Sequence, residues 1–209
     1  MATRLCIVRH GETAWNAEHR VQGQLDVALN ETGRAQAQAV AQALANDRFA
    51  AIYSSDLSRA RQTAEPVARR LSMRVLVEPG LRERHYGIFE RLTYAEVKQR
   101  HPEDYARFER RDPEYDFQTG EGLRAFAERA VRCVRALAGR HPGESILVVT
   151  HGGVLDKLYR FITGLPLSAP RDFAIPNCAI NRIEASSSWK ILSWADVSHL
   201  ESALDDLPE

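Results

Sequence analysis

The stretch Leu5-Cys6-Ile7-Val8-Arg9-His10-Gly11-Glu12-Thr13 begins with four apolar residues and continues as a charged and polar segment. A short apolar run that stops abruptly at charge and glycine predicts a buried strand, Leu5–Val8, which feeds a polar loop. A second run, Ser145–Val149, is apolar after its serine and is also followed by a polar segment, Thr150–Gly153. Continuous apolar character is typical of a central parallel strand that is covered on both faces.

Helical patterns separate the predicted strands. Asn30 or Thr32 can cap a helix whose alanine and aliphatic residues recur near the helical period, and Ser55 or Asp56 can cap a second helix to about Leu71. Strands that alternate with helices predict an α/β protein, a three-layer α/β/α sandwich around a largely parallel sheet, in a single domain over residues 1–209. The further predicted strands are Ala51–Ser54, Arg74–Val77, Ala179–Glu184 and Lys190–Trp194, and the further predicted helices are Thr93–Arg111 with a break at Pro102, Leu123–Leu137 and one that begins after Gly153.

The composition is that of a folded protein without a preference for charged partners. Apolar residues make up 44% of the 209 residues, and the 28 basic and 28 acidic side chains cancel. Because the net charge is zero, no global field attracts nucleic acid or an anionic membrane, and neither is an expected partner. No apolar stretch approaches the roughly 20 residues that span a bilayer, and the first residues lack a secretory pattern, so we expect a cytoplasmic protein.

The chain carries no pattern typical of a metal site or a disulfide framework. Cys6, Cys133 and Cys178 are widely separated, and no C-x-x-C, H-x-H or H-E-x-x-H spacing occurs. The glycine-rich patterns that bind nucleotides, G-x-x-x-x-G-K-[ST] and G-x-G-x-x-G, are also absent. We therefore expect no metal ion in the site.

Cationic and ionisable side chains lie where the predicted strands end. Arg9 and His10 follow the first strand, Arg59 lies in the opening turn of the helix after the second, and His151 follows the central one. Ligands of an open α/β sheet bind beyond the carboxyl ends of its strands, so we expect these side chains to meet. Each alone is more simply explained as a surface or capping residue. Together, beside a helix that begins after Gly153, they predict a pocket for a phosphate group.

Two segments fall outside the alternating pattern. Residues 92–122 form a polar stretch that we expect to be a cap inserted over the active site. Its aromatic side chains have two interpretations, packing within the cap or an apolar wall for a substrate; they are Tyr94, Tyr105, Phe108, Tyr115 and Phe117. The acidic tail, residues 201–209, is expected to be a solvated end with a tendency to disorder.

Four motifs, in order along the chain, resemble those of the histidine phosphatase superfamily, which includes the cofactor-dependent phosphoglycerate mutases. R-H-G alone would be a weak signal, but four separate motifs are specific, and they cover nearly the whole chain. The resemblance implies a phosphoglycerate mutase-like fold. The motifs R-H-G-[EQ]-[ST], S-x-L-x-R-A-x-x-T, L-x-E-x-x-x-G and T-H-G-G occur here within Arg9–Thr13, Ser55–Thr63, Leu81–Gly87 and Val149–Gly153.

The resemblance also implies roles for individual residues. His10 would be the nucleophile that forms a phosphohistidine, and Glu83 would be the general acid and then the general base. Without the family, Glu83 is equally well a loop carboxylate paired with a neighbouring arginine. Arg9, Arg59 and His151 would hold the phosphoryl oxygens, and the expected substrate-binding residues are Asn16, Gln22, Gly23, Tyr86 and Gly152. Arg61 is expected to lie outside the pocket, because it is about 200° round the helix from Arg59.

Hydrolysis of a phosphomonoester and a mutase reaction share their first half and differ in whether water or a second hydroxyl attacks the phosphoenzyme. The short middle segment without a proline-rich run, Gln22-Gly23, and an ending Asp196–Leu200 like that of broad-specificity phosphatases favour a phosphatase. The pair His85-Tyr86 points toward a mutase, which would need bisphosphoglycerate as its cofactor. A protein phosphatase or a non-catalytic phosphate-binding module is a lesser alternative. The expected partner is a small phosphorylated metabolite, and the expected state is a monomer or homodimer.

Overall fold

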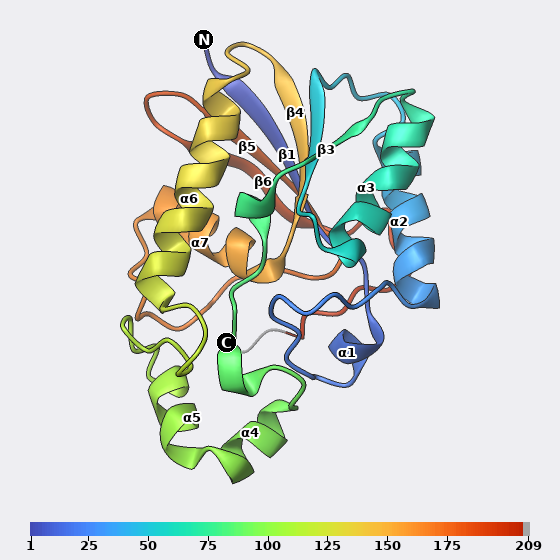
Figure 1. Ribbon diagram of the computed structural model, residues 1–209. Coiled ribbons are helices and arrows are strands. Elements are labelled where there is room, and N and C mark those ends of the chain that lie inside the picture. The colour runs from blue at the N-terminus through green and yellow to red at the C-terminus, as the bar shows by residue number, and fades with distance from the viewer. Residues whose placement is uncertain (207–209) are drawn as a thin grey trace.

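One six-stranded sheet, in the order β3-β2-β4-β1-β5-β6, forms the centre of residues 1–206, the part of the chain that the computed structural model describes. Four neighbouring strands, from β3 to β1, are mutually parallel, whereas β5 is antiparallel to β1 and β6 is antiparallel to β5 (Figure 1). The predicted α/β fold with a largely parallel sheet is therefore confirmed. The strands are β1 (Thr3–Arg9), β2 (Ala51–Ser54), β3 (Val75–Val77), β4 (Ser145–Thr150), β5 (Ile180–Ala185) and β6 (Lys190–Asp196).

Helices cover both faces of the sheet and complete the three layers. The long helices α2 and α3 lie on one face, and α6 and α7 lie on the other (Figure 1). The helices within residues 1–206 are α1 (Ala14–Ala17), α2 (Glu31–Ala43), α3 (Ser58–Arg70), α4 (Tyr94–Arg100), α5 (Pro102–Glu109), α6 (Leu123–Gly139) and α7 (Gly152–Thr163), with short 3₁₀ turns at Pro79–Leu81 and Gly87–Phe89.

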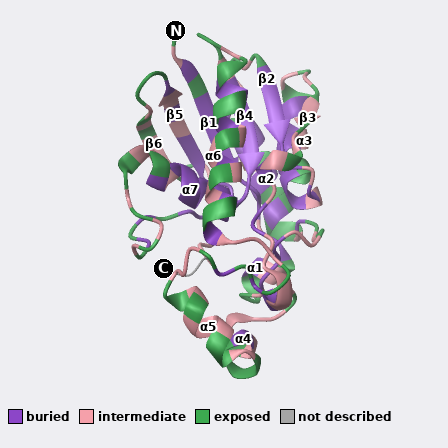
Figure 2. Ribbon diagram, turned by 60° about the vertical axis from the view of Figure 1, so that its left-hand side comes forward, coloured by how far each residue is buried: buried purple, intermediate pink, exposed green. Residues whose placement is uncertain are grey.

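The central strand β4 shows why the sheet is covered on both sides. Ile146 and Val148 pack into the cluster under α6 and α7, while Leu147 and Val149 pack into the cluster under α2 and α3. All four side chains are fully buried, and the central strands β1, β2 and β4 are mostly buried, whereas the edge strands β3 and β6 are more exposed (Figure 2). Burial of an aliphatic side chain stabilises the fold by about 1.5–3 kcal/mol, so this strand anchors the site residues that follow it.

The start of α3 differs from the prediction. Neither Ser55 nor Asp56 caps this helix, because Leu57 occupies the N-cap position and provides no side-chain cap. Asp26 instead accepts hydrogen bonds from the Ser58 backbone N–H (2.7 Å) and from its hydroxyl (2.8 Å). The Ser55 hydroxyl is engaged elsewhere, in the site described below. The cap of α2 is as predicted, since the Asn30 side chain accepts from the Gly33 N–H.

Residues 92–122, termed the cap segment, contain α4 and α5 and lie beyond one end of the sheet (Figure 1). The cap has its own apolar cluster, in which Phe89 and Phe117 meet edge to face at 4.9 Å between ring centroids. Tyr115 and Phe117 are buried in this cluster, in keeping with the packing interpretation. Tyr105 and Phe108 pack against the same cluster and also line a cavity, and their role as a wall for a substrate stays a prediction.

No helix in residues 1–206 combines the length and the apolar character needed to cross a bilayer.

Candidate active site

The parallel pairing of β1 with β4 brings two of the predicted site residues together. Arg9 is opposite Thr150 in the register of this pair, so His10 and His151 leave the sheet from neighbouring strand ends. Their ring centroids are 5.2 Å apart. The backbone N–H of His10 donates to the Thr150 carbonyl at 2.9 Å, which continues the strand pairing by one residue and holds His10 in place.

The imidazole of His10 is held with one nitrogen available for attack. Its Nδ1 lies 2.8 Å from the carbonyl oxygen of Gly11, so a neutral ring donates from Nδ1 and keeps its lone pair on Nε2. The pKa of His10 lies well below its usual value, first because the ring is buried and then because Arg59 and Arg9 repel a second positive charge. His10 is therefore a neutral imidazole at pH 7, with an unprotonated Nε2, which is the state that a nucleophilic role would require.

Two buried guanidinium groups flank His10. Arg9 and Arg59 are each 1% exposed. Arg9 donates to the Ile175 carbonyl at 2.6 Å, and Arg59 donates to the Leu25 and Gly23 carbonyls at 2.8 and 2.7 Å. The Nε of each arginine has no hydrogen-bond partner within residues 1–206. Burial lowers the pKa of Arg59 to about 10, and a buried cation with an unused donor favours an anionic ligand.

His151 adds a third unused donor. Its Nε2 lies 2.8 Å from the Ser55 hydroxyl, and its buried Nδ1 has no partner in the described part of the chain. When the Ser55 hydroxyl donates to Nε2, the proton of the neutral ring resides on Nδ1 and can be donated to a ligand. Burial, followed by the charge of Arg59, sets the pKa of His151 well below its usual range. Sequence reasoning gave Ser55 no such role, although it stands within a quoted motif.

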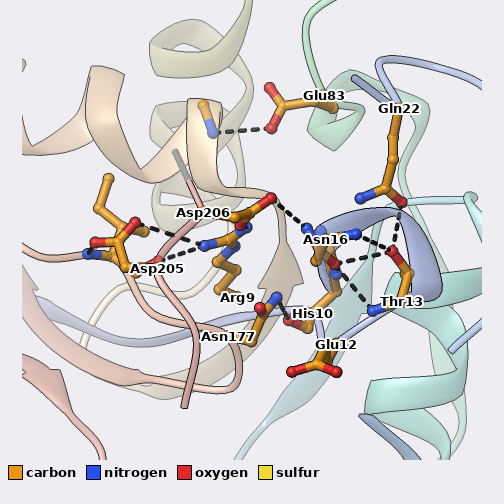
Figure 3. A network of polar contacts seen from close by, with 12 residues as sticks. Arg9, His10, Glu12, Thr13, Asn16, Gln22, Glu83, Asn177, Asp205 and Asp206 are labelled. Atoms are coloured by element: carbon orange, nitrogen blue, oxygen red, sulfur yellow. Dashed lines mark hydrogen bonds and ion pairs between the residues drawn. The ribbon is translucent and has the colours of Figure 1, made fainter. Parts of the chain in front are cut away.

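Thr13 orients the two amide side chains of the site. Its hydroxyl lies 2.9 Å from Oδ1 of Asn16 and 3.0 Å from Oε1 of Gln22, and its backbone N–H donates to the same Asn16 oxygen at 2.9 Å (Figure 3). Because both amide oxygens face Thr13, both amide nitrogens are directed away from it as donors. Sequence reasoning placed Asn16 and Gln22 in the site but missed Thr13, whose only signal was its place in the first motif.

Glu83 is fixed by two backbone donors. Its Oε2 accepts from the Gly153 N–H at 2.9 Å, and its Oε1 accepts from the Arg84 N–H at 2.7 Å. Gly153 lies in the first turn of α7, where backbone N–H groups and the helix dipole favour a carboxylate. A Cβ at Gly153 would lie 2.1 Å from Oε1 of Glu83, so only glycine admits the carboxylate at this position.

Gly153→Ala is expected to lower kcat by about 10²-fold, because the added methyl group forces Glu83 out of place and small displacements of a catalytic group are costly. Gly139→Ala is the matched control: within residues 1–206, no atom lies within 4 Å of the position that its Cβ would take, and it is expected to leave kcat unchanged. Steady-state kinetics of both variants on one phosphomonoester make the comparison. Equal kcat values for Gly153→Ala and the wild type would contradict a catalytic position for Glu83.

The remaining predicted residues are placed as follows. Gly23 has a left-handed backbone (φ +54°), and its carbonyl oxygen accepts from Arg59. Gly152 is the buried first residue of α7, directly after His151. Tyr86 stands at the edge of the cap cluster, 5.1 Å from the Phe117 ring, and lines the cavity described below. Arg61 is exposed and forms an ion pair with Glu65 at 3.7 Å.

A carboxylate from the end of the described chain occupies the centre of this site. Asp206 accepts hydrogen bonds from the terminal nitrogen Nη2 of Arg9 and from Nδ2 of Asn16, the latter at 2.8 Å (Figure 3). An anionic group thus lies where the sequence predicts phosphate. Sequence reasoning gave the tail no function; residues 207–209 of the predicted tail lie outside the described residues.

The two buried histidines predict a loss of stability in mild acid. Below pH 6.5 the unfolded chain protonates both imidazoles, while the folded chain, with their pKa values well lowered, does not. The free energy of unfolding is therefore expected to fall as pH decreases from 6.5 to 5, by up to about 1.4 kcal/mol per pH unit for each histidine. Urea unfolding at several pH values measures this slope. His10→Gln should reduce it, and an unchanged slope would contradict the buried neutral state of His10.

Within residues 1–206, no group of three or more His, Cys, Asp or Glu side chains is arranged to hold a metal ion. The donors gathered here are arginines, imidazoles and amides, and they suit an anion. A three-layer α/β/α sandwich with these anion-binding groups beyond the carboxyl ends of its parallel strands is typical of an α/β enzyme that acts on phosphorylated substrates.

The chain belongs to the histidine phosphatase superfamily (branch 1), whose family model matches residues 5–197. It is 42% identical to phosphoglycerate mutase-like protein 4 of Arabidopsis thaliana, over 94% of this chain and 86% of that protein. It is 39% identical to a metal-independent phosphoserine phosphatase of the same plant, over 96% of this chain and 84% of that protein. The solved structure of YhfR from Bacillus stearothermophilus superimposes with a TM-score of 0.89 at 35% identity, over 95% of this chain and all (100%) of that one.

Proposed function

We propose that this protein hydrolyses small phosphomonoesters through a phosphohistidine on His10. The observation that carries the proposal is the set of unused buried donors around that ring: Nε of Arg9, Nε of Arg59 and Nδ1 of His151. Phosphoryl transfer requires alignment of the reacting groups and neutralisation of the equatorial oxygens, and fixed cationic donors supply both. Asn16 and Gln22 add neutral donors to the same anion.

The reaction has two steps that use the same residues. In the first, Nε2 of His10 attacks phosphorus in line, the ester P–O bond breaks, and protonated Glu83 gives its proton to the leaving alkoxide. In the second, the carboxylate of Glu83 takes a proton from water, whose oxygen attacks phosphorus. The P–N bond then breaks, the electron pair returns to Nε2, and inorganic phosphate leaves.

A cavity of about 320 Å³ beside Glu83 is where we place the leaving alcohol. Gly153, the residue that holds Glu83, is part of its wall, so the cavity adjoins the proposed proton donor. Aromatic side chains form its apolar lining: Tyr105 and Phe108 from the cap, Phe126 from α6, and Tyr86 from the segment that precedes the cap. A cavity of this volume and apolar character fits the alcohol of a small organic phosphomonoester better than it fits a phosphorylated protein.

The same cavity carries an excess of positive charge. Its ionisable lining residues are Arg84, Arg111, Lys157 and Arg171 against Glu109 and Asp156. Lys157 is paired with Asp156, whereas within residues 1–206 the Arg111 side chain forms no ion pair and donates one hydrogen bond, to the Ala169 carbonyl at 3.4 Å. We therefore propose a substrate whose leaving group bears a second anionic group, such as a carboxylate, in addition to the phosphate.

The mutase remains the second candidate because of this positive charge. A second anionic subsite next to the phosphoryl site could also retain a bisphosphorylated ligand, which a mutase reaction needs as its cofactor. Arg111 is the residue that favours this alternative, since it extends from the cap into the cavity. The oligomeric state, a monomer or homodimer, and the cytoplasmic location both stay predictions.

Phosphate release from a panel of phosphomonoesters, beside a phosphoglycerate mutase assay with and without bisphosphoglycerate, tests the proposal. We expect hydrolysis without isomerisation, with the highest kcat/KM for substrates that carry a carboxylate. Arg111→Gln should lower kcat/KM for those substrates about 10-fold and leave that for an uncharged ester unchanged. Isomerisation that depends on bisphosphoglycerate would establish the mutase instead.

A further inference from the structure

The last described residues, Ser202–Asp206, cross the site as a strap. Three hydrogen bonds hold the strap, one to α2 and two to the segment that precedes β5. The Gln36 side chain donates to the Ser202 carbonyl at 3.2 Å, the Asn177 backbone N–H donates to the Leu204 carbonyl at 2.8 Å, and the Ile175 N–H donates to the Asp205 carboxylate at 2.7 Å. The strap thus follows a defined path over the sheet end, and its position does not depend on Asp206 alone.

The Asp206 carboxylate is bound by two of the side chains that are proposed to hold the phosphoryl group. One oxygen is bound by Arg9 and the other by Asn16, and the Asp206 side chain is only 9% exposed (Figure 3). The two oxygens of a carboxylate carry negative charge, and their spacing is similar to that of two oxygens of a phosphoryl group. A phosphoryl group held by the same two side chains would lie beside this carboxylate, and repulsion between the two negative charges opposes binding of both.

Asp205, the preceding residue, reaches the other half of the site. Its carboxylate accepts from Arg171 at 2.8 Å and lies 3.9 Å from Arg9. Arg171 is one of the cations that line the leaving-group cavity. The strap therefore engages one cation of each half of the site, as the doubly anionic substrate proposed above would.

We propose that the strap is an internal competitor: Asp206 occupies the phosphoryl site of the resting protein, and substrate or inorganic phosphate binds by displacing it. The inference rests on the proposed function, since it takes Arg9 and Asn16 as phosphoryl ligands. A tethered carboxylate acts at a millimolar effective concentration, so weak anions are excluded while a phosphate dianion with more donors displaces it. If the open form makes up about a tenth of the molecules, the apparent affinity for phosphate is lowered about 10-fold.

Binding of inorganic phosphate, measured by calorimetry without turnover, tests the competition. Asp206→Asn removes the charge and keeps an acceptor for Arg9, and Asp206→Ala removes both. We expect phosphate to bind more tightly in the order wild type, Asp206→Asn, Asp206→Ala, with a gain of about 10-fold for the last. Glu201→Gln removes the same charge from the same tail at an exposed residue and is expected to match the wild type. Equal phosphate affinities in all four proteins would overturn the proposal.

Displacement has a second readout that charge removal alone does not produce. In the wild type, saturating phosphate should speed hydrogen exchange at the Asn177 amide about 10-fold, because this N–H loses the Leu204 carbonyl when the strap leaves. Unchanged exchange would overturn displacement even if the Asp206 variants bind phosphate more tightly. Arg59→Ala distinguishes failure of the competition from failure of the proposed function, because the Arg59 side chain donates to the Leu25 and Gly23 carbonyls and not to the strap. Phosphate affinity of this variant equal to that of the wild type would refute the phosphoryl site itself, and with it the proposed function.

Discussion

His10→Ala is expected to abolish phosphate release, with a loss in kcat of about 10⁴-fold or more. Nε2 of His10 is the one described nucleophile next to Arg9 and Arg59 that is buried, neutral and free of a partner bond. Within residues 1–206 no second nucleophile can replace it here, because Nε2 of the other imidazole, His151, is engaged by the Ser55 hydroxyl. Phosphate release from a phosphomonoester measures the loss.

Two further measurements make this result specific. His10→Ala should still bind inorganic phosphate, because the arginines remain, and wild-type protein quenched during turnover should carry an acid-labile phosphoryl group that the variant lacks. His19→Asn is the control, since His19 is exposed and asparagine tolerates its left-handed backbone (φ 51°). Full activity in His10→Ala would assign the nucleophile to another residue.

Glu83→Gln is expected to lower kcat for alkyl phosphates by about 10³-fold, because glutamine has the same size and shape but no acidic proton for the leaving group. Its single carbonyl oxygen can accept from either the Gly153 or the Arg84 N–H, so the amide variant keeps one of the two backbone hydrogen bonds and is expected to keep its fold. The loss should be much smaller for 4-nitrophenyl phosphate, whose leaving group departs without protonation.

The comparison of the two esters distinguishes a proton donor from a structural carboxylate. A structural role would lower the rates of both esters alike, and that outcome would contradict the assignment. Glu103→Gln is the matched control, because Glu103 is an exposed carboxylate in the first turn of α5 and its removal should change neither rate.

The parts of this molecule that could be predicted from sequence are those encoded by local pattern. Apolar runs located β1 and β4, and the order of strands and helices implied that their carboxyl ends share an edge. The meeting of His10 with His151 follows from that geometry alone. The predicted N-cap of α3 was wrong, because the Ser55 hydroxyl forms a hydrogen bond with His151 rather than with the first turn of the helix. Local sequence does not reveal this, since the two residues are 96 positions apart.

The strap and the leaving-group cavity could not be predicted, for a related reason. Composition marks an acidic tail as solvated, and only the fold brings Asp206 within reach of Arg9, 197 residues away in sequence. In the same way, Arg111 and Lys157 share a cavity because the cap lies against α7. Contacts between residues so far apart in sequence leave no periodic pattern of apolar residues from which they could be predicted.

The separate apolar cluster of the cap has a consequence for how this enzyme changes over time. Within the described chain, it shares no residue with the clusters on the two faces of the sheet. Tyr105, Phe108 and Arg111 can therefore be exchanged without repacking β1 or β4, which carry the reacting groups. The residues proposed to select the substrate are thus packed apart from those proposed to break the bond, and we expect natural drift or a mutant library restricted to α5 and its following loop to yield new substrate preferences with the same chemistry.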